Sequence, residues 1–493
     1  MMPAPAWKLV RQRLVSVASA PLLAALLLAF PLPASAHFFI QSYSLPIPFW
    51  MYAWGAAGAL LLSFMAAGIF ASVPGTTQAH GWSSRAQTQD LSPAAPSAGG
   101  YVALGLLVLC IASGFAGPAK SVDNFNMTFF WIIFVLGVPY ITAFIGDFYA
   151  RMNPWETLVV LAEKLAGKPF TGRLQGPERW GHWPALILYG GFIHLELFGH
   201  LLPRGVSGWL LAYTGLNVAG AWLLGRRAWF QQGEFFAVLL RLLGKMAPLE
   251  HGTHGLRLRM PFSGLWKDHP KDLGLVVFIL FMLSSTAFDG LHATKPWVDL
   301  YWSGINPLLT GGWGLSPREQ NTVSVALYQL WQPTGLAAFP FIYLVLYAAI
   351  VLAMKAVVRS GLTLRELLCK FAFCLVPIAF VYHVTHYFTL LFAQGGQILR
   401  LVSDPLGVGW NVFGTGKWVI EPLMIDMGTL WHTQVGLILA GHVASVWVAH
   451  VQALTMFETP GRAALSQLPM LALMMAFTAF GLWILSLPLA AGG

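Results

Sequence analysis

The sequence predicts an all-α protein, a polytopic transmembrane bundle of about ten helices that follows a cleavable signal peptide. Composition leads to this fold class. Hydrophobic residues make up 57% of the 493 residues, charged residues make up only 10%, and the mean hydropathy is +0.66. A soluble chain carries roughly a quarter charged residues. The composition therefore indicates an integral membrane protein.

Residues 1–36 have the pattern of a signal peptide. They contain a basic region around Lys8, an apolar region from Leu22 to Phe30 and a small-residue cleavage site at Ala34–Ala36. Cleavage would make His37 the mature N-terminus, where an α-amino group and an imidazole on one residue can chelate copper together. The alternatives are an ordinary residue after a cleavage site, or a first helix that is not cleaved.

Residues 37–493 are interpreted as a single integral-membrane helical domain. A helix needs about 20 apolar residues to cross the bilayer. The windows that predict spans are 48–72, 101–117, 127–146, 183–201, 207–225, 273–293, 334–356, 369–393, 427–452 and 467–489. The three cysteines lie in or beside these windows and form neither a disulfide framework nor a CxxC metal motif.

The basic residues of the loops predict the orientation. Segments 147–182, 226–272 and 355–370 hold most of the lysines and arginines, and the loops of the other side hold few. Because basic loops stay in the cytoplasm, we expect the inner membrane of a bacterium, with the mature N-terminus in the periplasm. The net charge of +9 then reflects the lipid bilayer as partner and does not indicate nucleic acid.

Four further segments lie outside the predicted spans. Stretches 155–166 and 231–246 mix apolar and charged residues, which predicts amphipathic helices along the inner leaflet. The external segments 294–333 and 394–426 are rich in Gly, Pro, Trp and Asn. Their tryptophans are expected at the headgroup level, and these loops could fold over a site as a lid.

Ionisable side chains inside the predicted spans are the main functional signal. In lipid such a group is costly unless it is paired, bound to a metal or facing a wet cavity. The residues concerned are His194, Glu196, His200, Asp289, His292, His383 and His386. Their number and their position toward one face predict an intramembrane metal or proton site.

The first group follows a helical spacing. Glu196 and His200 are one turn apart on a helix, so both could bind one ion, whereas His194 is offset by about 160° from Glu196. His194 would join them only if the helix is broken or the ion lies elsewhere. The alternative is that His200 lies at the interface and Glu196 pairs with Arg204.

The second group, Asp289 and His292, has i, i+3 spacing near the outer end of its span. The aspartate could bind a metal directly or orient an imidazole that does. The alternative is ordinary capping polarity at a helix end.

The motif Tyr382-His383-Val-Thr-His386-Tyr387 is the strongest local signal. Imidazole is the commonest metal ligand, and the tyrosine hydroxyls could hydrogen-bond a bound water or an oxyanion. The next predicted helix offers His442 as a third candidate ligand.

Several short segments carry a resemblance to a known family. They are Ala36-His37 with Ser44–Trp50, Ala287–Leu291, Tyr382–Tyr387, Ser403–Trp410 with Phe413-Gly-Thr, and Gly441-His442 with His450. In these segments the chain resembles bacterial multi-pass proteins known as fenitrothion hydrolases. The resemblance implies a phosphoric triester hydrolase that cleaves organophosphorus triesters such as fenitrothion and releases a nitrophenol. The resemblance is compatible with a second membrane subunit, and it assigns no catalytic residues.

The first functional hypothesis is a membrane-embedded, metal-dependent hydrolase of an apolar small molecule. A divalent metal (zinc, manganese, cobalt or copper) would lower the pKa of a bound water and polarise the phosphoryl group. The candidate catalytic residues are Asp289, Glu196, Tyr382 and Tyr387, and the candidate metal ligands are His383, His386, His442, His292, His194, His200 and His37.

The second hypothesis is a copper-handling or electron-transfer membrane protein. His383 or His386 opposite His442 could hold a b-type haem, and His37 with the outer histidines could handle copper. A structural or transport role is the third, although the sequence contains no inverted repeat of the transporter type.

Overall fold

The computed structural model describes residues 47–71, 96–174, 179–252 and 255–487. The signal peptide and His37 lie outside these described residues. The described chain is helical, as predicted, apart from loops and one antiparallel hairpin of β1 (Leu249–Gly252) and β2 (Gly255–Leu258).

Eight helical segments of the described chain are long and apolar enough to cross a membrane. They are α3 (Phe49–Ala71), α4 (Ala98–Ala116), η3 with α5 (Met127–Gly137 and Val138–Ile145), α13 (Leu273–His292), α16 (Pro317–Val358), α17 to α19 (Leu364–Ala372, Val376–Gln394 and Ile398–Leu401, joined by η7 at Phe373–Leu375 and η8 at Gly395–Gln397), α20 (Met427–Met456) and α21 (Pro460–Ser486). By the length and composition of these helices, the chain is a multi-pass membrane protein.

The other two predicted spans are also helices, α8 (Trp183–Phe198) and α9 (Pro203–Leu224). Shorter elements connect the spans. They are η2 (Ser121–Asp123), α6 (Tyr149–Met152), α7 (Pro154–Ala166), α10 (Arg226–Ala228), η5 (Trp229–Gly233), α11 (Phe235–Gly244), α12 (Ser263–Trp266), α14 (Lys295–Asp299), η6 (Leu300–Ile305) and α15 (Asn306–Thr310).

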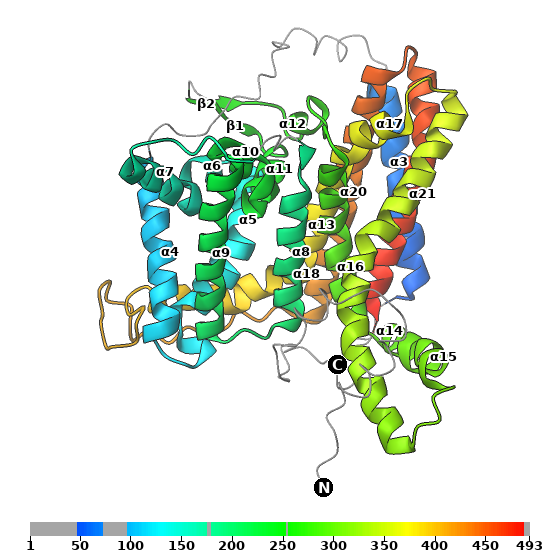
Figure 1. The fold of residues 1–493 in the computed structure, drawn as a ribbon. Helices are drawn as coiled ribbons and strands as arrows, with labels where there is room; N and C mark the ends of the chain where they lie inside the picture. The colour runs from blue at the N-terminus through cyan, green and yellow to red at the C-terminus, as the bar shows by residue number, and fades with distance from the viewer. Residues whose placement is uncertain (1–46, 72–95, 175–178, 253–254, 488–493) are drawn as a thin grey trace.

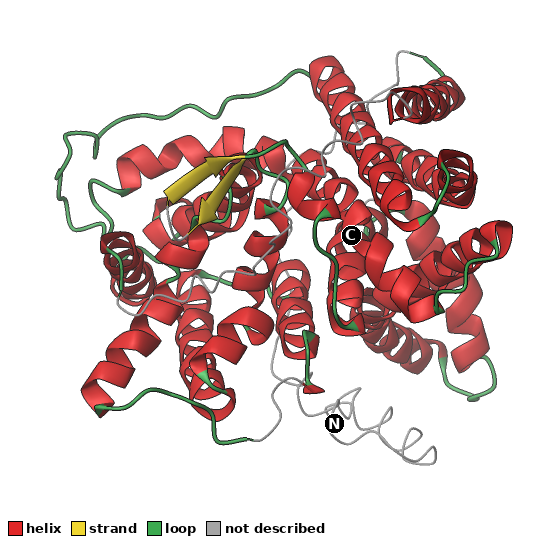
Figure 2. Ribbon diagram, turned by 90° about the horizontal axis from the view of Figure 1, so that it is seen from above, coloured by secondary structure: helices red, strands yellow, loops and turns green. Residues whose placement is uncertain are grey.

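The helices form two groups that lie side by side (Figures 1 and 2). In the first group α4 packs on α7 and α9, and α11 packs on α5 and α8. In the second group α13 packs on α16 and α18, while α20 and α21 pack on each other and on α3. Contacts of α8 with α13 and of η3 with α18 join the groups. The seam between them is where the polar residues meet.

The segments predicted to be cytoplasmic lie at one end of the bundle. Helices α7, α10, α12 and α17 and the hairpin are at the upper end in Figure 1, and α14 and α15 are at the lower end. This arrangement agrees with the separation of basic and weakly charged loops in the sequence.

Helix α16 is longer than the predicted span 334–356. It begins with a capping box in which the Ser316 backbone N–H and hydroxyl both donate to Glu319 Oε2, at 3.0 and 2.7 Å. Its 42 residues extend about 63 Å at 1.5 Å per residue, twice the apolar thickness of a bilayer. Its first half therefore projects beyond the membrane, and much of the predicted external loop 294–333 is helical.

Helix α11 also differs from the expectation of a helix along the inner leaflet. Glu234 caps it by accepting hydrogen bonds from the backbone N–H groups of Phe236 and Ala237, at 3.0 and 2.7 Å. Phe235, Phe236 and most of the following apolar side chains are buried between α5 and α8. The apolar face of α11 is thus covered by protein, because α11 packs against α5 and α8.

Candidate active site between the two helix groups

Asp289 is the centre of a polar cluster that joins α13 to α18. Its Oδ2 accepts hydrogen bonds from His386 Nε2 at 2.6 Å and from the Tyr387 hydroxyl at 2.6 Å. The Asp289 side chain is 6% exposed, so the carboxylate is shielded from bulk solvent. Two donors on one oxygen compensate for the cost of burying it.

His292 lies beside this cluster without bonding the carboxylate. Its Nδ1 donates to the backbone oxygen of Asp289 at 2.8 Å and is 3.8 Å from Asp289 Oδ1. The His292 ring stacks on Phe288 at a centroid distance of 5.6 Å. The predicted shared face of Asp289 and His292 is present, and packing fixes the orientation of the imidazole.

A cavity borders the cluster in the seam between the helix groups. The cavity is small, with a volume of about 50 Å³, and part of it is open. Most of its lining is apolar, from η3, α5, α8, α11, α13 and α18. Its polar lining consists of Tyr189, Glu196, Ser285, Thr286, His383 and Tyr387. An apolar chamber with a few polar groups on its wall is the usual form of a small-molecule site.

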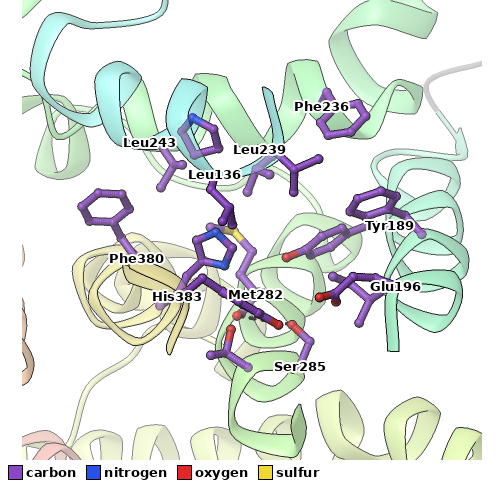
Figure 3. A pocket seen from close by; sticks show the side chains of 17 residues that line it. Leu136, Tyr189, Glu196, Phe236, Leu239, Leu243, Met282, Ser285, Phe380 and His383 are labelled. Carbon is purple, nitrogen blue, oxygen red and sulfur yellow. Dashed lines mark hydrogen bonds between the residues drawn. The ribbon is translucent and has the colours of Figure 1, made fainter. Parts of the chain in front are cut away.

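The polar side chains of the cavity face one another. Figure 3 shows Glu196, Tyr189 and Ser285 turned toward the same space, with His383 across from them. The His383 ring lies between Tyr140 and Tyr387, at centroid distances of 5.9 and 4.9 Å. Tyr387 therefore belongs both to the cavity wall and to the Asp289 cluster.

Helix α8 brings Glu196 to the cavity but leaves the other two residues of its motif outside. The helix ends at Phe198, and His200 has a positive φ of 41°. His200 is exposed and cannot share a helical face with Glu196, which corrects the predicted pairing. His194 packs on Phe198 at a ring distance of 5.3 Å and does not line the cavity. Gly199 is the C-cap of α8, and Pro203 is the first residue of α9.

Tyr382 and His442 lie away from the cavity, toward α20 and α21. The Tyr382 hydroxyl donates to the backbone oxygen of Phe477. His442 is fully buried and its Nδ1 donates to the Ile438 oxygen at 2.9 Å, while its Nε2 has no hydrogen-bond partner among the described residues. The rings of Tyr382 and His442 are 6.0 Å apart. These two candidates form a packing contact separate from the Asp289 cluster.

The donor types of the cluster suit a divalent metal, but their arrangement does not. A carboxylate and an imidazole are common zinc ligands, yet Asp289 and His386 are hydrogen-bonded directly to each other. Among the described residues, no three His, Cys, Asp or Glu side chains form a group that could hold an ion. The histidines predicted to complete the shell are separated: His442 and His200 lie elsewhere, and His37 is outside the described residues.

A haem between α18 and α20 does not fit this packing. A Cβ atom on Gly441 would lie 2.3 Å from a methyl carbon of Val381, so the two helices touch at this level. The Tyr382 ring occupies the space beside His442. A porphyrin between His442 and His383 or His386 would have to separate these helices.

The opposite ends of α8 and α13 are held together by Asp272. Its Oδ2 accepts a hydrogen bond from His182 Nδ1 at 2.7 Å, and its Oδ1 caps α13 by accepting from the Leu275 N–H at 3.1 Å. Burial alone would raise the pKa of Asp272, but the hydrogen bonds from His182 and Leu275 outweigh it and lower the pKa below the ordinary value of 3.8. This clamp fixes the two helices that carry Glu196 and Asp289.

Sequence reasoning missed two residues of the site. Tyr189 is two turns before Glu196 on α8, and that spacing could have assigned both to one face. Gln332 accepts a hydrogen bond from Trp297 Nε1 at 2.9 Å and donates to the His292 backbone oxygen at 3.5 Å. No local signal marks Gln332, because it reaches His292 only through the packing of α16 on α13.

The chain was compared with known proteins at three levels. No protein-family model, no curated protein and no solved structure matches it. The function proposed below is therefore argued from its own residues.

Proposed function

We propose that the chain is a membrane-embedded hydrolase of neutral, apolar organophosphorus triesters, with fenitrothion as the model substrate and a nitrophenol as one product. The observation that carries this proposal is the cavity in which His383, Glu196 and Tyr387 face a mostly apolar space. Tyr387 connects this space to the buried Asp289–His386 pair.

The setting suits this substrate class. A neutral triester partitions into the bilayer, so it can reach a site between helices without passing through water. The apolar lining would bind its aryl and alkyl groups. The polar groups on the wall would then lie next to the phosphorus centre and an attacking water.

His383 is proposed as the general base. A water oxygen attacks phosphorus, the water proton passes to an imidazole nitrogen of His383, and the bond from phosphorus to the aryl oxygen breaks. The nitrophenolate leaves with the bonding electron pair and needs little help from an acid. Glu196 and the Tyr387 hydroxyl oxygen accept hydrogen bonds from the water, because the Tyr387 proton is already donated to Asp289, which His386 also holds.

A divalent metal ion remains a separate proposal. Asp289 and His386 would hold it after moving apart, and it would polarise the phosphoryl group. Metal analysis of the purified protein, with activity measured before and after a chelator, decides this point. If activity survives removal of all metal, the metal proposal is wrong and only the mechanism with His383 as general base remains.

The test is nitrophenolate release from fenitrothion by the purified protein in lipid nanodiscs. His383→Gln is expected to lower kcat about 10²- to 10⁴-fold, the usual contribution of a general base. The matched control is His432→Gln, since His432 is exposed on α20 and bonds only its own helix in the described structure. Absence of activity in the wild-type protein would refute the proposed function. Activity that survives in His383→Gln would refute the role of His383 as general base.

A further inference from the structure

The loop between α19 and α20, residues 402–426, presents apolar side chains outward. We call it the outer loop. Its exposed residues include Trp410, Val412, Phe413, Trp418, Val419 and Met424, and Val419 is 90% exposed. A loop that faces water usually exposes polar side chains. Large apolar side chains exposed together mark an interaction surface.

Several polar groups of the outer loop bond to one another or to its backbone, whereas the side chains of Asn411, Lys417 and Glu421 are exposed. The Asp404 carboxylate accepts hydrogen bonds from the backbone N–H groups of Val408 and Gly409, at 3.0 and 2.7 Å. The hydroxyls of Ser403 and Thr415 are 2.6 Å apart. These bonds give the loop a defined shape, so its apolar side chains are held outward by its own backbone.

The outer loop lies against the end of a membrane-spanning helix. Arg400, just before it, pairs with Asp123 at 3.1 Å, and Gly407 packs closely on Pro118, which follows α4. In Figure 1 the orange-yellow loop at the lower left lies at the height of the lower end of α4. Phe115 near that end of α4 is itself 48% exposed, so the helix and the loop both expose apolar side chains.

We propose that the outer loop inserts its apolar side chains into the lipid bilayer at the headgroup boundary of the adjacent leaflet. Lipid is the favoured occupant because the loop packs against the segment that follows α4, a helix long and apolar enough to span the membrane. The depth is limited to the interface, since an irregular backbone facing the hydrocarbon core would leave polar groups unpaired. Tryptophans such as Trp410 and Trp418 favour this level of a membrane.

The experiment measures collision of a spin label with oxygen, which concentrates in lipid, and with a water-soluble nickel complex. Labels are placed by Phe413→Cys and Val419→Cys in a chain whose three native cysteines, all buried, are replaced by alanine. The protein is held in nanodiscs of phosphatidylethanolamine and phosphatidylglycerol. Val108→Cys on the exposed face of α4 is the lipid reference, and Arg318→Cys on the projecting part of α16 is the water reference.

The expected result is a collision ratio at 413 and 419 that is shifted toward oxygen relative to 318 but lies below that at 108, because residue 108 is near the middle of α4 and the loop is at the interface. Nickel accessibility equal to that at 318 would overturn the proposal, because the loop would then face water. Low accessibility to both probes would also overturn it, since a protein surface, such as a second membrane subunit, would then cover the loop.

Discussion

At the residue scale, two tyrosines of one motif have different surroundings. Tyr387 donates to Asp289 from the wall of the cavity, whereas Tyr382 donates to the backbone of α21. Both lie on α18, yet they point to opposite sides of it. Residue type and proximity in sequence therefore do not assign a shared role.

Replacing each tyrosine by phenylalanine separates these roles. Tyr387→Phe removes a hydrogen bond to a buried carboxylate worth about 1.5–3 kcal/mol, so kcat for fenitrothion should fall about ten- to a hundredfold and the melting temperature should fall as well. Tyr382→Phe removes a bond worth about 1 kcal/mol to a backbone oxygen, so melting temperature should fall while kcat stays. Steady-state kinetics and thermal unfolding of both variants check this. The reverse pattern would place Tyr382 in the reaction and Tyr387 in the packing.

At the element scale, the approach of α20 to α18 depends on a missing side chain. Gly441 lets the backbone of α20 contact Val381, whereas a Cβ on Gly436 of the same helix would meet no atom of the described residues within 4 Å. Small residues at such crossings allow close helix packing in membranes.

Gly441→Ala is expected to destabilise the protein by about 1–3 kcal/mol, because an added methyl group must push the helices apart. Gly436→Ala is the matched control and should be neutral or stabilising by up to about 1 kcal/mol, since alanine favours helix. Denaturant unfolding in a mild detergent measures both. Equal stability of the two variants would mean that α18 and α20 are not held at this distance.

The clamp at Asp272 gives the helix ends a pH dependence. Its pKa is lower in the folded protein than in the unfolded chain, because His182 and Leu275 stabilise the charged form. The stabilisation is therefore complete above the unfolded pKa of about 3.9 and is lost as pH falls through the folded pKa.

Asp272→Asn should melt below the wild type at pH 6, and the difference between the two melting temperatures should close below about pH 4. Glu421→Gln, a change at an exposed loop residue, serves as the control and should follow the wild type throughout. A difference that persists unchanged at low pH would show that the charge of Asp272 does not contribute.

At the scale of the whole molecule, the basic segments gather at one end of the bundle and the outer loop lies at the other (Figure 1). We propose that the basic end is cytoplasmic, as in a bacterial inner-membrane protein with a periplasmic N-terminus. The polar cluster at the lower ends of α13 and α18 would then lie nearer the periplasm.

Cysteine accessibility in intact cells tests this orientation. Lys417→Cys in the outer loop should react with a membrane-impermeant maleimide from outside, and Lys168→Cys after α7 should react only once the inner membrane is permeabilised. Both lysines are exposed in the structure, so failure to label would not come from burial. Labelling in the opposite order would invert the topology and place the cluster near the cytoplasm.

The sequence by itself determined the membrane class, the helices and the motif of α18. These follow from local properties: apolar length, and ionisable groups too costly to leave unpaired in lipid. It did not predict that α16 begins at Pro317. The capping box at Ser316 lies in a segment whose Gly- and Pro-rich composition predicts a loop.

Only the tertiary structure decided which polar residues meet. Asp289 and Tyr387 are 98 residues apart in the chain and join because α13 packs on α18, while His200 leaves the group where α8 ends and His442 is directed toward Tyr382. Spacing fixes which residues share a face of one helix. Which faces meet depends on packing across the whole bundle, through contacts such as Gly441 on Val381 that no local pattern encodes.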